Sequence, residues 1–230
     1  MRSRNCRPDD LRPVIFDWSV VWYAAPLLAH GVLMTLQVSL VAGALGLALG
    51  LVLRLASLSG LRPLQWLVPC YVDFIRGTPL LIQIFLVFFA LPVVGLRLPE
   101  FWAGVVALAL NSGAYIAEVV RGAVGSIERG QAEAALSIGM TRGRVLWYVL
   151  LPQAWRPMLP PLTNDLITLT KNSSLLSAIS VYELTRAGQA VISTHFAPFE
   201  IYLLLALYYY LLVTGLSLLA RRLERSLPAW

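Results

Sequence analysis

Charged residues are scarce in this sequence. Only 13% of its 230 residues are Asp, Glu, Lys or Arg, while 58% are hydrophobic, whereas soluble domains contain about 25% charged residues. The surface of a water-soluble globule needs more charge than this chain supplies. The composition therefore argues against a soluble enzyme and predicts a protein that folds within lipid.

The side chains that usually carry catalysis, metal binding or crosslinking are also few. The single lysine, Lys171, is followed by Asn172, so the chain lacks the Lys-Ser or Lys-Thr pair of a GxxxxGK[ST] phosphate loop. The two histidines are far apart, and the two cysteines form no CxxC pair. HExxH and GxSxG motifs are likewise missing. We therefore expect no ATP site of the chain's own, no metal site, no cofactor and no disulfide framework.

Arginine is the one abundant charge, and its placement follows a pattern. The 17 arginines lie mostly between long apolar runs, so they indicate membrane topology rather than a nucleic-acid surface. A membrane-spanning helix needs about 20 mostly apolar residues. Five segments meet this requirement, and the sequence predicts an all-α integral membrane protein with spans at about 32–53, 78–96, 101–120, 162–182 and 201–220.

The domain organisation expected from these spans is simple. Residues 1–26 form an extracytoplasmic or interfacial segment without the pattern of a cleaved signal peptide, and residues 27–230 form one transmembrane domain. Five spans place the termini on opposite sides of the membrane. With the N-terminus outside, 11 arginines are cytoplasmic and 6 are external. The excess of cytoplasmic arginines predicts an external N-terminus and a cytoplasmic C-terminus.

The connection at 121–161, between the third and fourth spans, is too long for a simple turn, since most such links have only a few residues. Residues 131–138 are Ala-rich and favour a helix, Gly139 suits its C-terminal cap, and Thr141 suits the start of a second helix. We expect this second helix to end at Leu151, before Pro152. The sequence predicts a cytoplasmic helix-turn-helix loop.

Polar residues inside the third and fourth spans gather on one face of each predicted helix, within about 120° of arc at 100° per residue. Such residues are unfavourable in lipid and usually face a pathway or a partner helix. They either line the route of a polar solute or hold helices together. The candidate path residues are Asn111 and Tyr115 in the third span, and Asn164, Asp165 and Thr168 in the fourth.

Two charged residues on these faces keep both interpretations open, structural or path-lining. Glu118 is near the cytoplasmic end of its span, while Lys171 is near the midplane, so an ion pair between them is disfavoured by depth. Lys171 either meets a solute carboxylate or fixes its helix through carbonyl groups of a neighbour.

The 121–161 loop carries a recognisable pattern. Glu133-Ala134-Ala135, then Gly139, then Val149-Leu150-Leu151-Pro152 resembles the EAA signature of permease subunits of bacterial ABC importers, with Val149 where the pattern usually has Ile. Within these permeases the chain resembles the polar amino acid, or histidine and glutamine, family. The narrower resemblance rests on the segments 76–81, 130–135, 171–175 and 183–189, and it extends from about Phe16 to the C-terminus.

The resemblance implies a permease subunit that imports a polar amino acid across the bacterial cytoplasmic (inner) membrane by alternating access. It implies a second permease, identical or related, a cytoplasmic ABC ATPase dimer that hydrolyses ATP, and an extracytoplasmic solute-binding protein. The loop helix would enter a groove of the ATPase with Ala132, Ala135 and Leu136 on one face. The expected coupling residues are Gln131, Glu133, Ala134, Ala135, Gly139, Leu151 and Pro152.

Two other classes remain as alternatives. A self-sufficient secondary transporter or channel for a small polar solute would also need polar residues in its spans, and inverted repeats would favour it. We find no such repeat in the sequence. A membrane assembly or scaffold protein would need the polar residues only for contacts between helices.

Overall fold

The computed structural model describes residues 16–58 and 61–226, and every regular element within these ranges is helical. The all-α expectation is thereby confirmed for the described chain. The α-helices are α1 (Trp18–Leu58), α2 (Arg62–Gly77), α3 (Leu80–Ala90), α4 (Glu100–Gly125), α5 (Arg129–Ser137), α6 (Arg142–Val145), α7 (Leu151–Asn172), α8 (Leu184–His195) and α9 (Pro198–Ser226).

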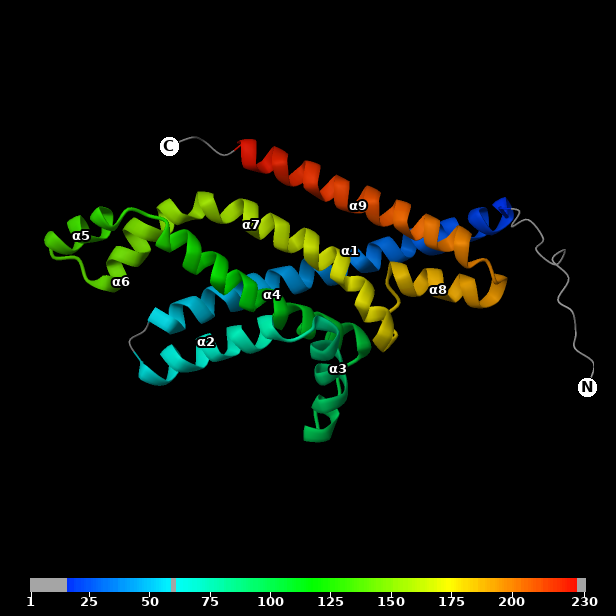
Figure 1. The fold of residues 1–230 in the computed structure, drawn as a ribbon, viewed down its shortest axis with the longest axis horizontal. Helices are drawn as coiled ribbons and strands as arrows, with labels where there is room; N and C mark the ends of the chain where they lie inside the picture. The colour runs from blue at the N-terminus through cyan, green and yellow to red at the C-terminus, as the bar shows by residue number, and fades with distance from the viewer. Residues whose placement is uncertain (1–15, 59–60, 227–230) are drawn as a thin grey trace, which may run out of the picture.

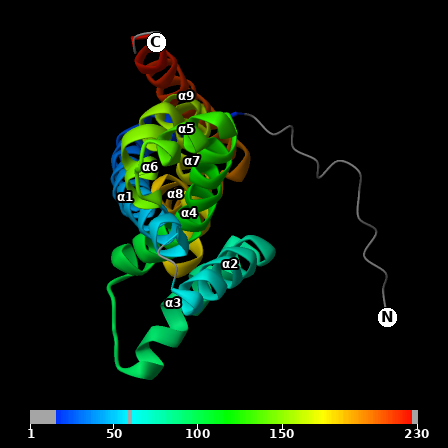
Figure 2. The same ribbon diagram turned by 90° about the vertical axis from the view of Figure 1, so that its left-hand side faces the viewer.

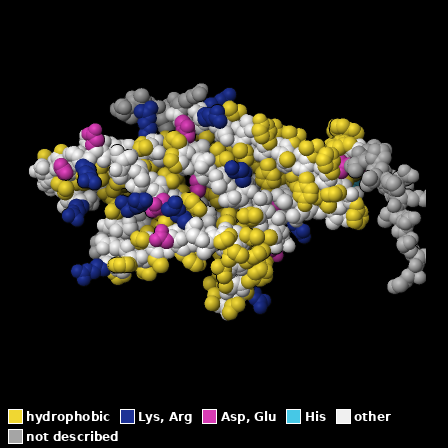
Figure 3. All heavy atoms as spheres, in the orientation of Figure 1, with side chains coloured by type: hydrophobic (Ala, Val, Ile, Leu, Met, Phe, Trp, Pro, Cys, Tyr) yellow, Lys and Arg dark blue, Asp and Glu magenta, His cyan; other side chains and the backbone are white. Residues whose placement is uncertain are grey.

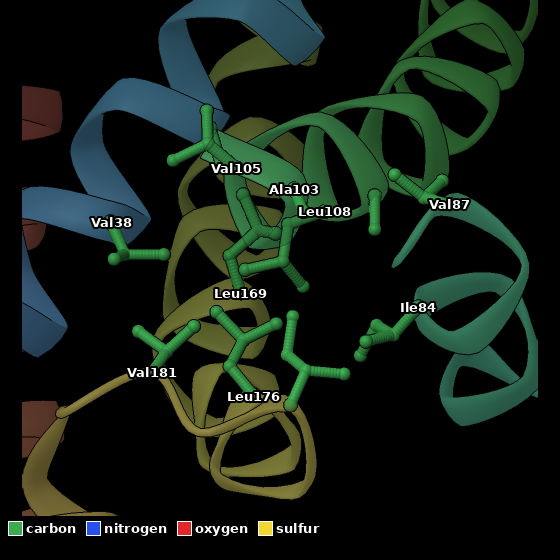
Figure 4. Packing of buried hydrophobic residues seen from close by; sticks show 12 residues of the cluster. Val38, Ile84, Val87, Ala103, Val105, Leu108, Leu169, Leu176 and Val181 are labelled. Atoms are coloured by element: carbon green, nitrogen blue, oxygen red, sulfur yellow. The ribbon is translucent and has the colours of Figure 1, made fainter. Parts of the chain in front are cut away.

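Four long helices, α1, α4, α7 and α9, extend along the long axis of the molecule, with α5 and α6 at one end and α8 at the other (Figure 1). Helices α2 and α3 lie to one side of this bundle (Figure 2). The largest core cluster joins Val38 of α1, Ile84 of α3, Leu108 of α4 and Leu169 of α7 (Figure 4). The core therefore holds the third and fourth expected spans against the first.

Length and composition qualify three helices of the described chain, α1, α4 and α9, to cross a membrane, or four if the bent pair α2 and α3 forms one broken span. The long helix α7 contains Arg156, Asp165 and Lys171 and falls outside this set. Helix α1 has 41 residues, about 60 Å at 1.5 Å per residue, twice the thickness of a bilayer core. It begins at Trp18 with Pro26 inside it, so the helix extends across residue 26, and the expected division of the chain there stays a prediction. Residues 1–15 of that expected segment lie outside the described chain.

The second expected span, 78–96, differs from the structure. Thr78 and Pro79 are extended and separate α2 from α3, and the two helices are bent by 111°. Helix α3 is followed by a 3-10 turn at Leu91–Val94, which Gly95 ends at φ 87°. Proline disfavours helical geometry at the residue before it. The helix therefore stops at Gly77 and restarts in a new direction.

The fourth expected span, 162–182, is also shifted. Helix α7 begins at Leu151, contains Pro157, Pro160 and Pro161, and follows directly on a π-helical turn, Leu146–Leu150. Prolines are tolerated in membrane helices where neighbouring groups and local adjustments satisfy the freed carbonyls. At the other end α7 passes into a 3-10 helix, Ser173–Ile179. The second loop helix therefore does not end at Leu151, because it continues through Pro152 into α7.

Candidate functional site

A cavity of about 420 Å³ opens between α4, α7 and the break that separates α2 from α3. All five residues expected to line a solute path line this one cavity. Its lining consists of Thr78, Leu80, Asn111, Tyr115, Val119, Pro161, Asn164, Asp165, Thr168, Leu169 and Asn172. The helical period thus predicted which polar residues share a cavity, and their role in transport stays a prediction.

Helix α7 supplies the polar wall of the cavity. Asn164, Asp165, Thr168 and Asn172 are spaced so that one face of a continuous helix presents them all. Helix α7 begins at Leu151 and continues through Pro157, Pro160 and Pro161. The face that carries these polar residues is therefore helical along its whole length. Asp165 is the one formally charged residue among those that line the cavity.

A short hydrogen bond ties Asp165 to α4. The Oγ atom of Ser112 donates to Oδ2 of Asp165 at 2.5 Å, and Ser112 is buried in the α1–α4 contact. One carboxylate oxygen is thereby held, and the carboxylate stands at the edge of the cavity. The helices α4 and α7 are joined at the level of the site.

Asn111 is more strongly engaged than the sequence suggested. Its Nδ2 donates to Oε1 of Gln83 at 2.9 Å, and Nε2 of Gln83 donates to the carbonyl of Ile75 at 2.7 Å and to Oγ1 of Thr78 at 2.9 Å. This chain of bonds satisfies polar groups that the break at Thr78 and Pro79 leaves free. Asn111 therefore fixes the broken helix to α4 as well as lining the cavity.

Glu118 and Lys171 lie away from the cavity wall. Glu118 is paired with Arg121 at 2.6 Å and with Arg76 at 3.5 Å, and it lines a different cavity. Lys171 is exposed on α7 and is not part of the lining. No ion pair joins Glu118 and Lys171 in the described chain, and their separation by depth in the membrane stays a prediction.

Tyr115 links the two cavities. Its ring lines the first cavity, and the guanidinium carbon of Arg76, which lines the second, lies 5.6 Å from the ring centre. A guanidinium at this distance is attracted to the negative face of an aromatic ring. Arg76 thus contacts both Tyr115 and Glu118, one turn apart on α4.

The expected loop helix is present as α5. Gly139 follows it at φ 85°, and Met140 N donates to the carbonyl of Ala135 at 3.2 Å, the pattern of a left-handed helix cap. Thr141 Oγ1 accepts from Arg144 N and caps α6. The hairpin is therefore built as the sequence predicted up to α6.

The faces of α5 differ from the expectation in one respect. Gln131, Glu133 and Ala134 are exposed, whereas Ala135 is 6% exposed, and α5 packs on α6 and on the π-helical turn. Ala135 therefore faces the interior of the hairpin and not an outer surface that a partner would cover. Leu151 is partly buried, while Pro152 is exposed at the start of α7.

The sequence analysis did not predict three polar residues of this site. Thr78 and Asn172 line the cavity, and Gln83 anchors Asn111. Thr78 adjoins Pro79, which signals a break in the helix, and Asn172 lies on the polar face of α7. Gln83 gave no signal beyond being a polar residue in an apolar segment. Among the described residues, no group of three or more His, Cys, Asp or Glu could hold a metal ion.

Comparison with known proteins gives consistent results. Residues 44–228 match the family described as "Binding-protein-dependent transport system inner membrane component". The chain is 44% identical over 214 residues to the glutamine transport system permease protein GlnP of Escherichia coli (strain K12), covering 92% of this chain and 98% of the relative. It is 37% identical to the arginine transport system permease protein ArtQ of Bacillus subtilis (strain 168), covering 93% and 98%.

A solved structure also superposes closely on the chain. It is described as the crystal structure of an amino acid ABC transporter with histidines, and it matches with a TM-score of 0.87 at 37% identity. The match covers 93% of this chain and all of the other.

Proposed function

The chain belongs to the family of binding-protein-dependent transport system inner membrane components, the permease subunits of ABC importers, and from this premise we propose that it carries a polar amino acid through the cavity between α4 and α7. The resemblance of the loop to the EAA signature agrees with this membership. The substrates named for similar permeases include glutamine and arginine. A polar amino acid is the class common to them.

The observation that carries the proposal is the lining of the cavity. Tyr115, Asn164, Asp165, Thr168 and Asn172 all line one space of about 420 Å³. An amino acid carries two charges through a low-dielectric region, so fixed polar groups must offset its desolvation. A set of amides and hydroxyls with one carboxylate provides such groups. Helix contacts alone do not require an open space between the polar side chains.

A second permease chain completes the proposed path. Helix α3 projects away from the bundle (Figure 1), and it exposes Ile82, Leu86 and Phe89. The cavity is adjacent to its first turn, at Leu80. A second permease, identical or related, would cover this apolar helix and close the path.

The proposed positions of the ATPase dimer and the solute-binding protein follow from the orientation of the chain in the membrane. Arginines gather over the half of the molecule that carries α2, α5 and α6 (Figure 3), which supports a cytoplasmic position for the loop, an external N-terminus and a cytoplasmic C-terminus in the inner membrane. The exposed Gln131, Glu133 and Ala134 would contact the ATPase dimer, which hydrolyses ATP. A solute-binding protein would dock at the opposite end, near α8.

Transport by the reconstituted importer tests the path. We expect Asp165→Asn to lower uptake about tenfold or more while the complex still assembles, since a hydrogen bond to a charged group contributes about 1.5–3 kcal/mol. Asn164→Ala should alter the ranking of a panel of labelled amino acids. Cys70→Ala, at an exposed position of α2 that does not line the cavity, is the control and should keep wild-type uptake. Wild-type rates and selectivity in both cavity variants would assign these residues to helix contacts.

Coupling to ATP hydrolysis is tested separately. We expect Glu133→Lys or Gly139→Asp to abolish solute-stimulated ATPase activity in liposomes, because Gly139 holds a φ of 85° that a side chain makes unfavourable. Gly143→Asp, in the adjacent α6, is the control for added charge. Normal stimulation in both coupling variants would contradict the assignment of the loop. Full transport by the permease without any ATPase would favour the self-sufficient transporter instead.

A further inference from the structure

A second cavity, of about 410 Å³, lies between α1, α2 and α4. It differs from the proposed amino acid path in charge, because five charged residues line it, whereas Asp165 is the one charged residue that lines the path. Three arginines and two acids line it together with apolar groups: Arg54, Ser57, Val68, Pro69, Val72, Asp73, Arg76, Ala117, Glu118 and Arg121. No step of the proposed transport cycle uses this cavity.

Its charges are not balanced within the described chain. Glu118 is already shared between Arg121 and Arg76. Arg54 donates from Nη1 to the hydroxyl of Ser57 at 3.2 Å, and its buried Nε has no acceptor among the described residues. Arg54 is therefore a half-buried guanidinium that borders the cavity and forms no ion pair within the described chain. The Glu118 carboxylate attracts it only at longer range, because that carboxylate is already paired with two other arginines.

Arg54 also marks the point where this charged cavity meets an apolar groove. An adjoining space of about 160 Å³ is lined by Arg54 and by the apolar side chains Leu51, Leu55, Leu58, Val120, Val124, Leu146, Trp147 and Leu151. A wider opening of about 750 Å³ shares Arg54, Ser57 and Trp147 with these spaces and adds Arg142. The charged cavity and the apolar groove thus meet at Arg54.

We propose that this composite cavity binds an anionic phospholipid from the cytoplasmic leaflet, with its phosphate at Arg54 and an acyl chain along Trp147. Basic pockets between membrane helices on the cytoplasmic side suit anionic headgroups, and guanidinium groups form strong bonds to phosphate oxygens. The apolar groove selects a lipid over a free phosphate, because only a lipid fills both parts. The cytoplasmic placement rests on the orientation proposed above.

Quenching of Trp147 fluorescence by brominated lipid tests the proposal. The complete importer is reconstituted in phosphatidylcholine with either acyl-brominated phosphatidylglycerol or acyl-brominated phosphatidylcholine, and the difference between wild type and Trp147→Phe isolates the Trp147 signal. We expect about fivefold stronger binding of the anionic lipid, the factor for one unpaired arginine near a membrane surface. Arg54→Gln should remove this preference, and Arg54→Lys should keep part of it.

Arg62→Gln is the matched control, because Arg62 is exposed on α2 and does not line the cavity. Equal quenching by the two brominated lipids, or an equal loss of preference in Arg62→Gln, would overturn the proposal. Inorganic phosphate added to the brominated phosphatidylglycerol vesicles should not displace the lipid, and displacement would assign the site to a free anion. If Arg54→Gln does not assemble, the comparison of the two lipids on the wild-type importer still decides.

Discussion

The two faces of helix α4 show how differently one helix can be used. Toward α1 the packing leaves no room for a methyl group. A Cβ added to Gly50 of α1 would lie 2.6 Å from Cγ2 of Ile116 on α4. A Cβ added to Gly113 of α4 would lie 2.7 Å from the side chain of Leu49 on α1. Toward α7 the same helix borders a cavity of about 420 Å³ at Asn111 and Tyr115. One face is filled and the other is open.

The difference separates stability from transport. Helices in lipid associate through close packing of small residues and through hydrogen bonds between helices, and α4 uses the first toward α1 and the second toward α7. Substitutions on the α1 face should therefore change the stability of the fold. Substitutions on the cavity face should change transport more than stability.

The largest effect is expected on the filled face. Gly50→Leu places a side chain where a Cβ alone would already meet Ile116 and the carbonyl of Gly113 at 2.9 Å, and we expect a loss of about 3 kcal/mol. Thermal stability of the purified importer in detergent measures it. Gly122→Leu on α4 is the control, because nothing lies within 4 Å of a Cβ there. Equal stability of the two variants would contradict close packing of α1 on α4.

The next largest loss of stability is expected from breaking the hydrogen bonds of Gln83, which connect α4 to the break between α2 and α3. Gln83→Leu leaves Nδ2 of Asn111 and the carbonyl of Ile75 without the partner that each has in the structure, and we expect destabilisation of about 1–3 kcal/mol. Thermal stability of the purified importer in detergent again measures this effect. Gln37→Leu, an exposed position on α1, should be neutral. If Gln83→Leu is neutral too, the hydrogen bonds of Gln83 do not hold the break.

A smaller effect is expected where the two faces meet. Ser112→Ala removes the bond to Asp165 and should destabilise the importer by about 1.5 kcal/mol, the lower end of the range for a hydrogen bond to a charged group. A double-mutant cycle with Asp165→Ala should give a coupling energy of similar size. Additive effects of the two substitutions would show that the bond contributes no net stability.

The smallest change in stability is expected from substitutions of Tyr115. Tyr115→Phe keeps the ring beside Arg76 and should leave stability unchanged, whereas Tyr115→Leu loses the contact, worth about 0.5–1 kcal/mol at an exposed site. Uptake measured with both variants shows whether the hydroxyl itself contacts the solute. A decrease in stability for Tyr115→Phe as large as for Tyr115→Leu would contradict a role for the ring.

The sequence alone determined what depends on local pattern. Apolar runs predicted helices in lipid, and the 3.6-residue period placed Asn111 and Tyr115 on one face and Asn164, Asp165 and Thr168 on another. Gly139 and Thr141 predicted the turn in the loop because caps are set by neighbouring residues. These features lie within single helices or turns, so the order of residues is enough to define them.

Only the tertiary structure decided which faces meet and where helices begin and bend. The apolar pattern predicted a span that starts at residue 162, yet the helix that packs against α4 begins at Leu151. The bond of Gln83 to Asn111 joins residues 28 positions apart, and the pair of Arg76 with Glu118 joins α2 to α4. Such contacts depend on how whole helices pack, and the spacing of residues along one helix carries no record of that packing.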